Sequence, residues 1–381
     1  MKIGYGAEHE SIREEFRKLL AAAPRPRLDE HPSDRARPLD HALWTRLAEL
    51  GWLATAIPEA HGGSGLDTMV LCVLAEEIGR NMAAVPFTAS ICGYAVGLKL
   101  TGAADALASV LPRIADGSAV GVLLTPDCWS KAPRLEPSNA GAPLLSGTAL
   151  NVLDGACATE AIACVDTGSA CRLVRIDLTQ AIRRGLDAAP LDLLHPPATL
   201  DFDRVGVDVL ASGVGAERRW KHMLDTYAVF VAFEQLGGAE AALEMARRHS
   251  LDRYAFGRPI GSFQAIKHML ADMLVSVELA RSNCHFGAAA LAMGAEIVAE
   301  AASVARISAT DAFRHCARGN IQIHGAFGVT WESDCHLYYR RAQALASSPG
   351  SPRFWKERLI ELLVRRRADT PGAMETAAGL A

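Results

Sequence analysis

The stretch "RYAFGRPIGSFQ", Arg253 to Gln264, interrupts two segments that have the pattern of long amphipathic helices. It contains two arginines, glycines at positions 257 and 261, and a proline at position 259. Glycine permits tight bends and proline lacks a backbone N–H, so this composition predicts a turn between two helices. Positive charge is therefore concentrated at one end of a helix pair.

The segments on both sides of the turn carry apolar residues at helical spacing, which indicates one face packed on a core. Before the turn the stripe is Trp220, Met223, Leu224, Tyr227, Phe230 and Val231, and after it Ile266, Met269, Leu270, Met273 and Val277. Residues 295–323 and 353–367 read as further helices. Several long helices with short joints predict a C-terminal bundle.

The rest of the chain divides into a helical part and a part rich in strands. Leu43, Leu47, Leu50 and Leu53 follow helical steps until Pro58, and residues 68–80 predict a buried helix. The glycine-rich residues 61–67 between them lack the lysine and preceding strand of a phosphate loop, so we interpret them as a connector.

Short apolar runs separated by Pro, Gly, Asp and Ser from about residue 118 to 214 predict a small β-sheet or barrel. The fold class is thus mostly α with a central β domain. The expected domains are an N-terminal helical domain (1–117), a middle β domain (118–215) and a C-terminal helical bundle (216–381).

Composition excludes several classes of protein. The 381 residues are 50% hydrophobic and 22% charged with a net charge of −4, which is ordinary for a globular chain and argues against nucleic-acid binding. No apolar run approaches membrane-spanning length, and the first residues do not resemble a signal peptide. The nine cysteines form no CxxC pair, so we expect reduced thiols and a cytoplasmic location.

Two glycine-containing turns are candidate anion sites. Arg253 and Arg258 have planar donor groups that suit phosphate oxygens, and Gln264 adds an amide, so a phosphate-bearing cofactor fits this turn. The alternative is a surface loop with solvated arginines. The second stretch, "QIHGAFGVTWE" at 322–332, can present backbone N–H groups to an anion, but Gly325 is equally consistent with an ordinary helix C-cap.

These stretches belong to longer segments that resemble the flavin-dependent acyl-CoA dehydrogenases. The N-terminal likeness lies in "LWTRLAELGWLATAIPEAHGGSGLD", "LAEEIGR" and "AVPFTAS". The C-terminal likeness lies in "EQLGGAEAALEMARRHSLDRYAFGRPIGSFQAIKHMLADM" and "QIHGAFGVTWESDCHLYYRRAQA". The resemblance covers nearly the whole chain and implies a dimer or tetramer that oxidises an acyl-CoA thioester, with FAD at a subunit interface.

The resemblance also assigns cofactor-binding residues. In the family, the R-x-x-F-G motif, the glutamine after it and the Q-x-x-G-G turn contact the FAD bound mainly by the neighbouring subunit. Carried over, these residues are Arg253, Phe256, Gln264, Gln322, His324, Gly325 and Ala326, where Ala326 replaces the usual second glycine. No metal site is expected, because His324 lacks partners at ligand spacing.

The chain departs from the family where the chemistry takes place. The family's catalytic glutamate follows the "YYRRA"-like segment, and Pro349 occupies that position here. Proline cannot act as a base, and it removes the N–H that in the family polarises the thioester carbonyl. In the branch that carries its base on the first bundle helix, the equivalent position is Tyr227.

The middle domain departs as well. The flavin loop reads "LTPDCWSK", which retains Thr125 and Ser130 without the glycine-rich spacing. The family's W-I-T-N segment aligns with "NVLD", so Asn151 and Leu153 replace the tryptophan and threonine that touch the flavin ring.

These losses predict one half of a heteromeric acyl-CoA dehydrogenase whose base and flavin-ring site lie on a partner chain. Two alternatives stay open: a self-sufficient homomeric enzyme with Glu234 as its base, and a non-catalytic stabilising subunit. Glu234 continues the apolar stripe, so its carboxylate is either paired, with an arginine such as Arg247, or functional.

Overall fold

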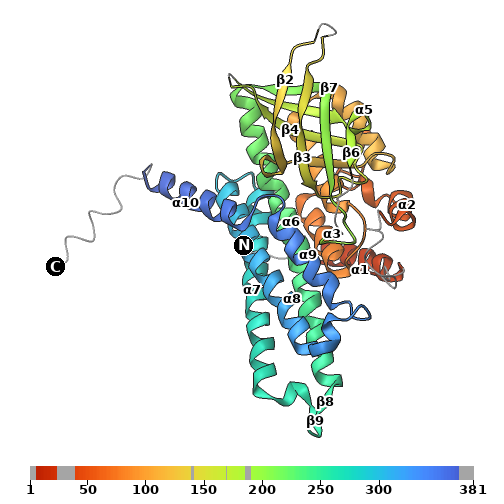
Figure 1. The fold of residues 1–381 in the computed structure, drawn as a ribbon, viewed down its shortest axis with the longest axis vertical. Coiled ribbons are helices and arrows are strands. Elements are labelled where there is room, and N and C mark those ends of the chain that lie inside the picture. The colour runs from red at the N-terminus through yellow and green to blue at the C-terminus, as the bar shows by residue number, and fades with distance from the viewer. Residues whose placement is uncertain (1–5, 24–38, 139–140, 169, 185–189, 369–381) are drawn as a thin grey trace, which may run out of the picture.

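The computed structural model describes residues 6–23, 39–138, 141–168, 170–184 and 190–368. A strand-rich part lies at one end of the molecule and a long helical bundle at the other, with the N-terminal helices against both (Figure 1). The observed fold is mostly α with a central curled sheet, as the sequence predicts. The domain boundaries at 117 and 215 stay a prediction, although helices, strands and helices follow in that order.

The N-terminal part consists of helices that surround a buried helix. They are α1 (Ala7–Ala22), α2 (His41–Glu49), α3 (Thr68–Asn81), a π-helix (Thr88–Ala95), α4 (Val96–Thr101) and α5 (Ala104–Ala115). Asp40 and Asp67 cap α2 and α3 by accepting hydrogen bonds from backbone N–H groups of the first turn, at 3.0 and 2.9 Å. Residues 70–79 of α3 are all buried, which confirms the expected buried helix.

The predicted continuous helix from Leu43 to Pro58 is wrong in its second half. Helix α2 ends at Glu49, and Gly51 adopts a left-handed conformation with φ 77°. A short 3-10 helix (Trp52–Ala54) follows, and Leu50 is 47% exposed. Glycine favours this reversal because it has no Cβ, so the apolar spacing alone overestimated the helix.

The middle part is a seven-stranded sheet in the order β1-β4-β5-β7-β3-β2, with β6 also paired to β7. The strands are β1 (Gly121–Leu124), β2 (Trp129–Glu136), β3 (Leu144–Val152), β4 (Glu160–Asp166), β5 (Cys171–Asp177), β6 (Ile182–Arg184) and β7 (Ala198–Ser212). Among the strands that the structure describes, β1 and β4 are the one parallel pair. The long strand β7 pairs with β3, β5 and β6, so it joins the two ends of the curled sheet.

The C-terminal part is the expected bundle. Its helices are α6 (Val214–Asp252), α7 (Gln264–Ala292), α8 (Val298–His324), α9 (Cys335–Ser347) and α10 (Pro352–Ala368). Helix α6 is its central element and is buried without a break from Met223 to Ala242. The turn after α6 is a short hairpin, β8 (Tyr254–Ala255) and β9 (Arg258–Pro259), at the far end of the bundle from the sheet (Figure 1).

Helices α3 and α6 touch backbone to backbone. A Cβ added at Gly79 would lie 1.8 Å from the carbonyl oxygen of Glu234, and one added at Gly237 would lie 1.8 Å from that of Glu76. Only glycine permits this approach, so two glycines fix the N-terminal helices on the bundle.

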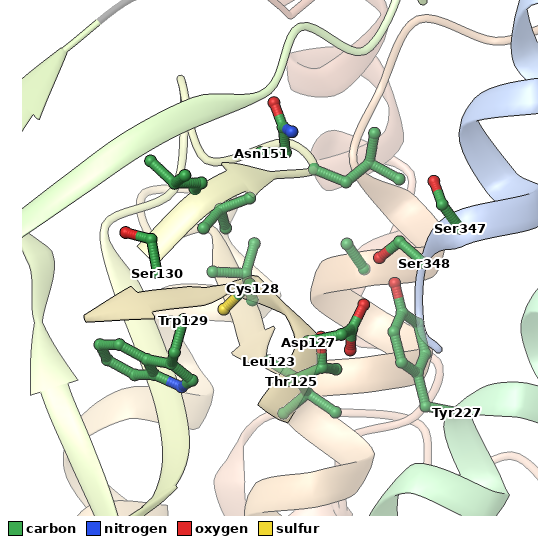
Figure 2. A pocket seen from close by; sticks show the side chains of 15 residues that line it. Leu123, Thr125, Asp127, Cys128, Trp129, Ser130, Asn151, Tyr227, Ser347 and Ser348 are labelled. Carbon is green, nitrogen blue, oxygen red and sulfur yellow. The ribbon is translucent and has the colours of Figure 1, made fainter. Parts of the chain in front are cut away.

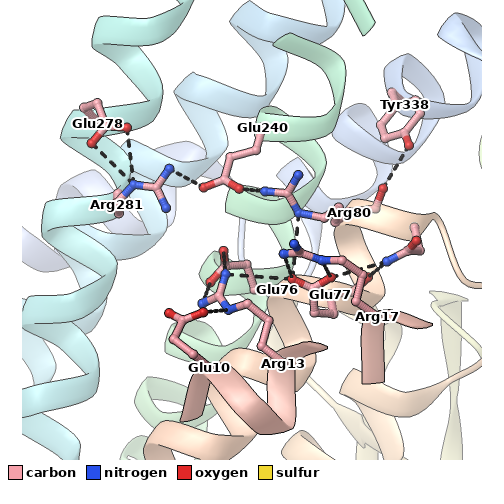
Figure 3. Close-up of polar contacts among 11 residues, drawn as sticks. Glu10, Arg13, Arg17, Glu76, Glu77, Arg80, Glu240, Glu278, Arg281 and Tyr338 are labelled. Atoms are coloured by element: carbon pink, nitrogen blue, oxygen red, sulfur yellow. Dashed lines mark hydrogen bonds and ion pairs between the residues drawn. The ribbon is translucent and has the colours of Figure 1, made fainter. Parts of the chain in front are cut away.

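A ladder of ion pairs crosses the same junction (Figure 3). Its members are Arg13 with Glu76, Arg17 with Glu77, and Glu240 with both Arg80 and Arg281. The ladder connects α1, α3, α6 and α7. Because Glu76 and Glu77 are fully buried, the pairs compensate carboxylates that would otherwise be destabilising.

The expectation that all nine cysteines are reduced is wrong for one pair. Cys164 of β4 and Cys171 of β5 form a disulfide, and the other seven cysteines are free. The two cysteines lie on neighbouring antiparallel strands, and their spacing in the sequence does not reveal this pairing. Among the described residues no helix is long and apolar enough to cross a membrane, and no cluster of three candidate metal ligands is found.

Candidate active site and dinucleotide-binding turn

A cavity of about 290 Å³ lies where the sheet meets the bundle. Its polar and aromatic lining comes from the β1–β2 connection, the end of β3, α6 and the end of α9: Thr125, Asp127, Cys128, Trp129, Ser130, Asn151, Tyr227, Ser347 and Ser348. Figure 2 shows these side chains around one cavity. The cavity thus brings together the flavin loop, the segment with Asn151 and Leu153, and Tyr227, and its lining residue Ser348 immediately precedes Pro349.

None of the described residues that line the cavity is a base shielded from water. Burial raises the pKa of Tyr227 far above its ordinary value, so the phenol stays protonated at neutral pH. Leu153 contributes only an aliphatic surface. Asp127 is the one carboxylate among the described lining residues, and no motif in the sequence marks it as a candidate. It is exposed, so it lacks the exclusion of water that acid–base carboxylates need.

The segment before Pro349 is held by a buried cation. The Arg306 guanidinium donates to the carbonyl oxygens of Leu345 and Ser348, the latter at 3.0 Å, and to Gln235 Oε1 at 2.6 Å. Burial lowers the pKa of Arg306 to about 10, so it remains charged at neutral pH. Pro349 accepts a hydrogen bond from Trp355 Nε1 at 2.7 Å and offers no N–H of its own.

Glu234 is buried and paired, but with a different arginine from the one expected. Arg341 donates to Glu234 Oε1 through Nε at 3.0 Å and through Nη2, and its Nη1 contacts Asp192 at 3.0 Å. Arg247 instead pairs with Glu244 on the surface at 2.7 Å, so the suggested Arg247 partner is wrong. Glu234 is not among the residues that line the cavity.

Burial alone would lower the pKa of Arg341, but Glu234 and Asp192 outweigh burial and raise it. The guanidinium is therefore a permanent cation shared by two buried carboxylates. Both nitrogen atoms that Arg341 directs at Glu234 bond to its Oε1, so this carboxylate is engaged in an ion pair rather than free for a substrate.

His195 and Asp154 form a second buried pair, and Asp154 directly follows the cavity residue Leu153 in the sequence. His195 Nδ1 lies 2.8 Å from Asp154 Oδ1 and its Nε2 lies 3.0 Å from the carbonyl oxygen of Ala83. Both partners are acceptors, so the geometry favours the doubly protonated ring. Burial and Arg341 lower the pKa of His195, but the neighbouring Asp154 outweighs them and the pKa is raised.

The turn after α6 presents its candidate residues to solvent. Arg253, Phe256 and Gln264 are exposed, Phe256 to 96% and with φ 52°. The guanidinium of Arg258 lies 4.1 Å from the Phe263 ring centroid, which orients it across the turn. An exposed arginine and a phenylalanine with 96% exposure are the side chains that a ligand or a second chain would cover.

The second candidate stretch lies beside this turn. Gln322, Gly325 and Ala326 are exposed, and Gly325 ends α8 with φ 64° and open space where a Cβ would stand. His324 stacks on His249 of α6 with ring centroids 4.0 Å apart. The structure therefore brings the two predicted cofactor-binding stretches to one end of the bundle, although they are distant in sequence.

The cavity is lined by Tyr227 in the first half of α6, whereas the turn follows the last residue of this helix, Asp252. Tyr227 and Asp252 are 25 residues apart on this helix, which at a rise of about 1.5 Å per residue separates them by about 38 Å.

The arrangement of a helical domain, a curled sheet and a helical bundle is also that of the solved acyl-CoA dehydrogenase structures to which this chain is similar. The acyl-CoA dehydrogenase N-terminal domain matches residues 6–118, and the acyl-CoA dehydrogenase C-terminal domain matches residues 218–354. The acyl-CoA dehydrogenase IpdE2 of Mycobacterium tuberculosis is 30% identical over 356 residues, which cover 91% of this chain and 94% of that protein. The chain belongs to the acyl-CoA dehydrogenase family, whose members are flavin-dependent oxidoreductases.

Solved structures give the same result for the fold. The steroid ACAD Tcur3481–Tcur3483 superposes with a TM-score of 0.84 at 26% identity, covering 95% of this chain and 99% of that one. The ChsE4–ChsE5 complex from Mycobacterium tuberculosis superposes with a TM-score of 0.86 at 21% identity, covering 98% of this chain and 100% of that one. The second likeness concerns the fold alone.

Proposed function

We propose that this chain is one subunit of a heteromeric acyl-CoA dehydrogenase that desaturates an acyl-CoA thioester between its α and β carbons. In this proposal the partner chain supplies the base and the flavin-ring site. The observation that carries the proposal is the cavity at the sheet–bundle junction, whose described lining has no shielded carboxylate. The names of the Tcur3481–Tcur3483 and ChsE4–ChsE5 structures each join two designations, which agrees with such a pairing.

The residues of the turn fit the pyrophosphate of a partner-bound FAD. Arg253 and Gln264 offer charged and amide donors, and Gly257 and Gly325 have open space where a Cβ would stand, so an anion can approach their backbone. The exposed ring of Phe256 offers a surface for a flat group. Gln322, His324 and Ala326 extend the same surface from the end of α8.

The cavity of this chain does not fit a catalytic flavin ring in the same way. Leu153 has no hydrogen-bonding group, and Pro349 has no N–H for a thioester carbonyl. FAD in this family accepts the hydride from the β carbon, and the α proton requires a base. Since Tyr227 stays protonated and Glu234 is paired with Arg341, this chain's contribution is to bind and orient the cofactor of its partner.

The proposal predicts that the chain alone binds little FAD and that co-expression with a neighbouring dehydrogenase gene restores a flavin spectrum. Arg253→Ala in the complex removes a charge-assisted hydrogen bond, which weakens FAD binding by roughly 30-fold, or about 2 kcal/mol. The measurement is FAD content after dialysis. Arg218→Ala, an exposed arginine at the other end of α6, is the matched control.

Each alternative gives a different result in the same experiment. A yellow homo-oligomer that reduces its own flavin with acyl-CoA supports the self-sufficient enzyme with Glu234 as base. A complex whose FAD content does not change with Arg253→Ala supports the non-catalytic stabilising subunit.

A further inference from the structure

The two ring nitrogens of His324, which stacks on His249 at the end of the bundle, have different hydrogen-bonding roles. His324 Nδ1 lies 2.9 Å from the carbonyl oxygen of Asn320, one turn earlier in α8. A carbonyl only accepts, so Nδ1 must carry the proton. In the neutral ring Nε2, on the far side from that carbonyl, is then an acceptor. Only the protonated ring offers a second N–H donor.

Stacking disfavours two positive charges on His249 and His324 when no ligand is bound. The rings of His249 and His324 are 4.0 Å apart at an interplanar angle of 24°, so two imidazolium ions would repel strongly. Burial, then His324 and Arg253, lower the pKa of His249, while Asp252 opposes them. Among the described residues, the titratable groups that shift the pKa of His249 are His324, Arg253 and Asp252, and the Phe327 ring lies 6.5 Å from the His324 ring between centroids. His249 is therefore neutral at pH 7.

We infer that the His249–His324 pair takes up a proton when the dinucleotide pyrophosphate binds at this end of the bundle, with His324 Nε2 as the new donor. This inference rests on the proposed function. A pyrophosphate brings negative charge next to the stack and Arg253, which favours the protonated ring. A neutral His324 would present a lone pair to that anion, so its binding is weaker.

The sign of the pH dependence follows from this coupling. Because the bound state holds more protons than the free state, FAD affinity falls as pH rises through the range of histidine titration. We expect Kd for FAD to rise on the order of tenfold between about pH 6 and pH 8. On the order of one proton is taken up per FAD bound near neutral pH.

The test uses the apo complex of this chain with its co-purified partner dehydrogenase. Calorimetric titration with FAD in PIPES and in Tris, which have different ionisation enthalpies, measures the protons taken up. His324→Asn keeps a donor toward Asn320 and removes Nε2, whereas His324→Phe keeps the stack and removes both nitrogens. The control is His222→Asn, an exposed histidine near the other end of α6.

The inference predicts proton uptake in the wild type and the control, and near-zero uptake with a flat pH profile in both His324 variants. If Arg253→Ala weakens FAD binding but the wild type takes up no proton, the inference is overturned and the proposed function stands. If neither Arg253→Ala nor the His324 variants change FAD binding, both fail, because the turn then does not contact the cofactor.

Discussion

Substitutions at Glu234 and at Arg341 test whether Glu234 is a structural carboxylate or a catalytic base. In Arg341→Met the buried Glu234 and Asp192 lose their shared cation, which costs about 3–5 kcal/mol. For a chain of this length we expect the melting temperature to fall by about 5 °C, since unfolding entropy grows with chain length. In Glu234→Gln, Arg341 keeps Asp192, so the loss is smaller, about 1–2 kcal/mol.

The assay pairs thermal unfolding, followed by circular dichroism, with acyl-CoA-dependent flavin reduction in the co-expressed complex. We expect Glu234→Gln to lower stability and to leave the reduction rate within about threefold. Glu244→Gln, in the surface pair with Arg247, is the matched control and changes neither. A loss of about 100-fold or more in rate with unchanged melting would show that Glu234 is the base, and the reasoning would be refuted.

Two further predictions concern packing and pH. Gly237→Ala places a Cβ 1.8 Å from the Glu76 carbonyl oxygen and destabilises the chain by about 3 kcal/mol or more in chemical denaturation, whereas Gly215→Ala on the same helix has open space and changes stability by less than about 1 kcal/mol. Equal losses would contradict the close contact. Because the pKa of His195 is raised, its pair with Asp154 stabilises the fold at low pH and this contribution is lost as pH rises above about 6.5. His195→Asn should flatten that part of the stability–pH curve, and an unchanged curve would disprove the charged pair.

The sequence predicts the architecture well because its signals are local. Helical stripes, the glycine and proline of the Arg253–Gln264 turn, and strand-like runs between turns each depend on neighbouring residues. The helix predicted to continue through Leu50 is wrong, because the left-handed conformation of Gly51 ends the helix although the apolar spacing continues. Strand β7 carries polar residues at many positions, so it gives no apolar run that would mark it as a strand in the sequence.

The sequence could not predict contacts that depend on tertiary structure. Glu234 and Arg341 are 107 residues apart, and no periodicity connects them. The stack of His249 on His324 requires α6 and α8 to end side by side, and the Cys164–Cys171 disulfide requires the register of β4 and β5. Asp127 was missed because its loop departs from the family pattern, which left no motif to mark a carboxylate at the cavity.

The proposal that this chain is one subunit of a heteromeric enzyme is tested most directly by the flavin-to-protein ratio. This ratio is measured for the polypeptide purified alone and for the polypeptide purified with its partner dehydrogenase. The account predicts almost no flavin absorbance for the chain alone and bound FAD that is lost on Arg253→Ala for the complex. Stoichiometric FAD on the isolated chain, bleached by an acyl-CoA, would contradict it.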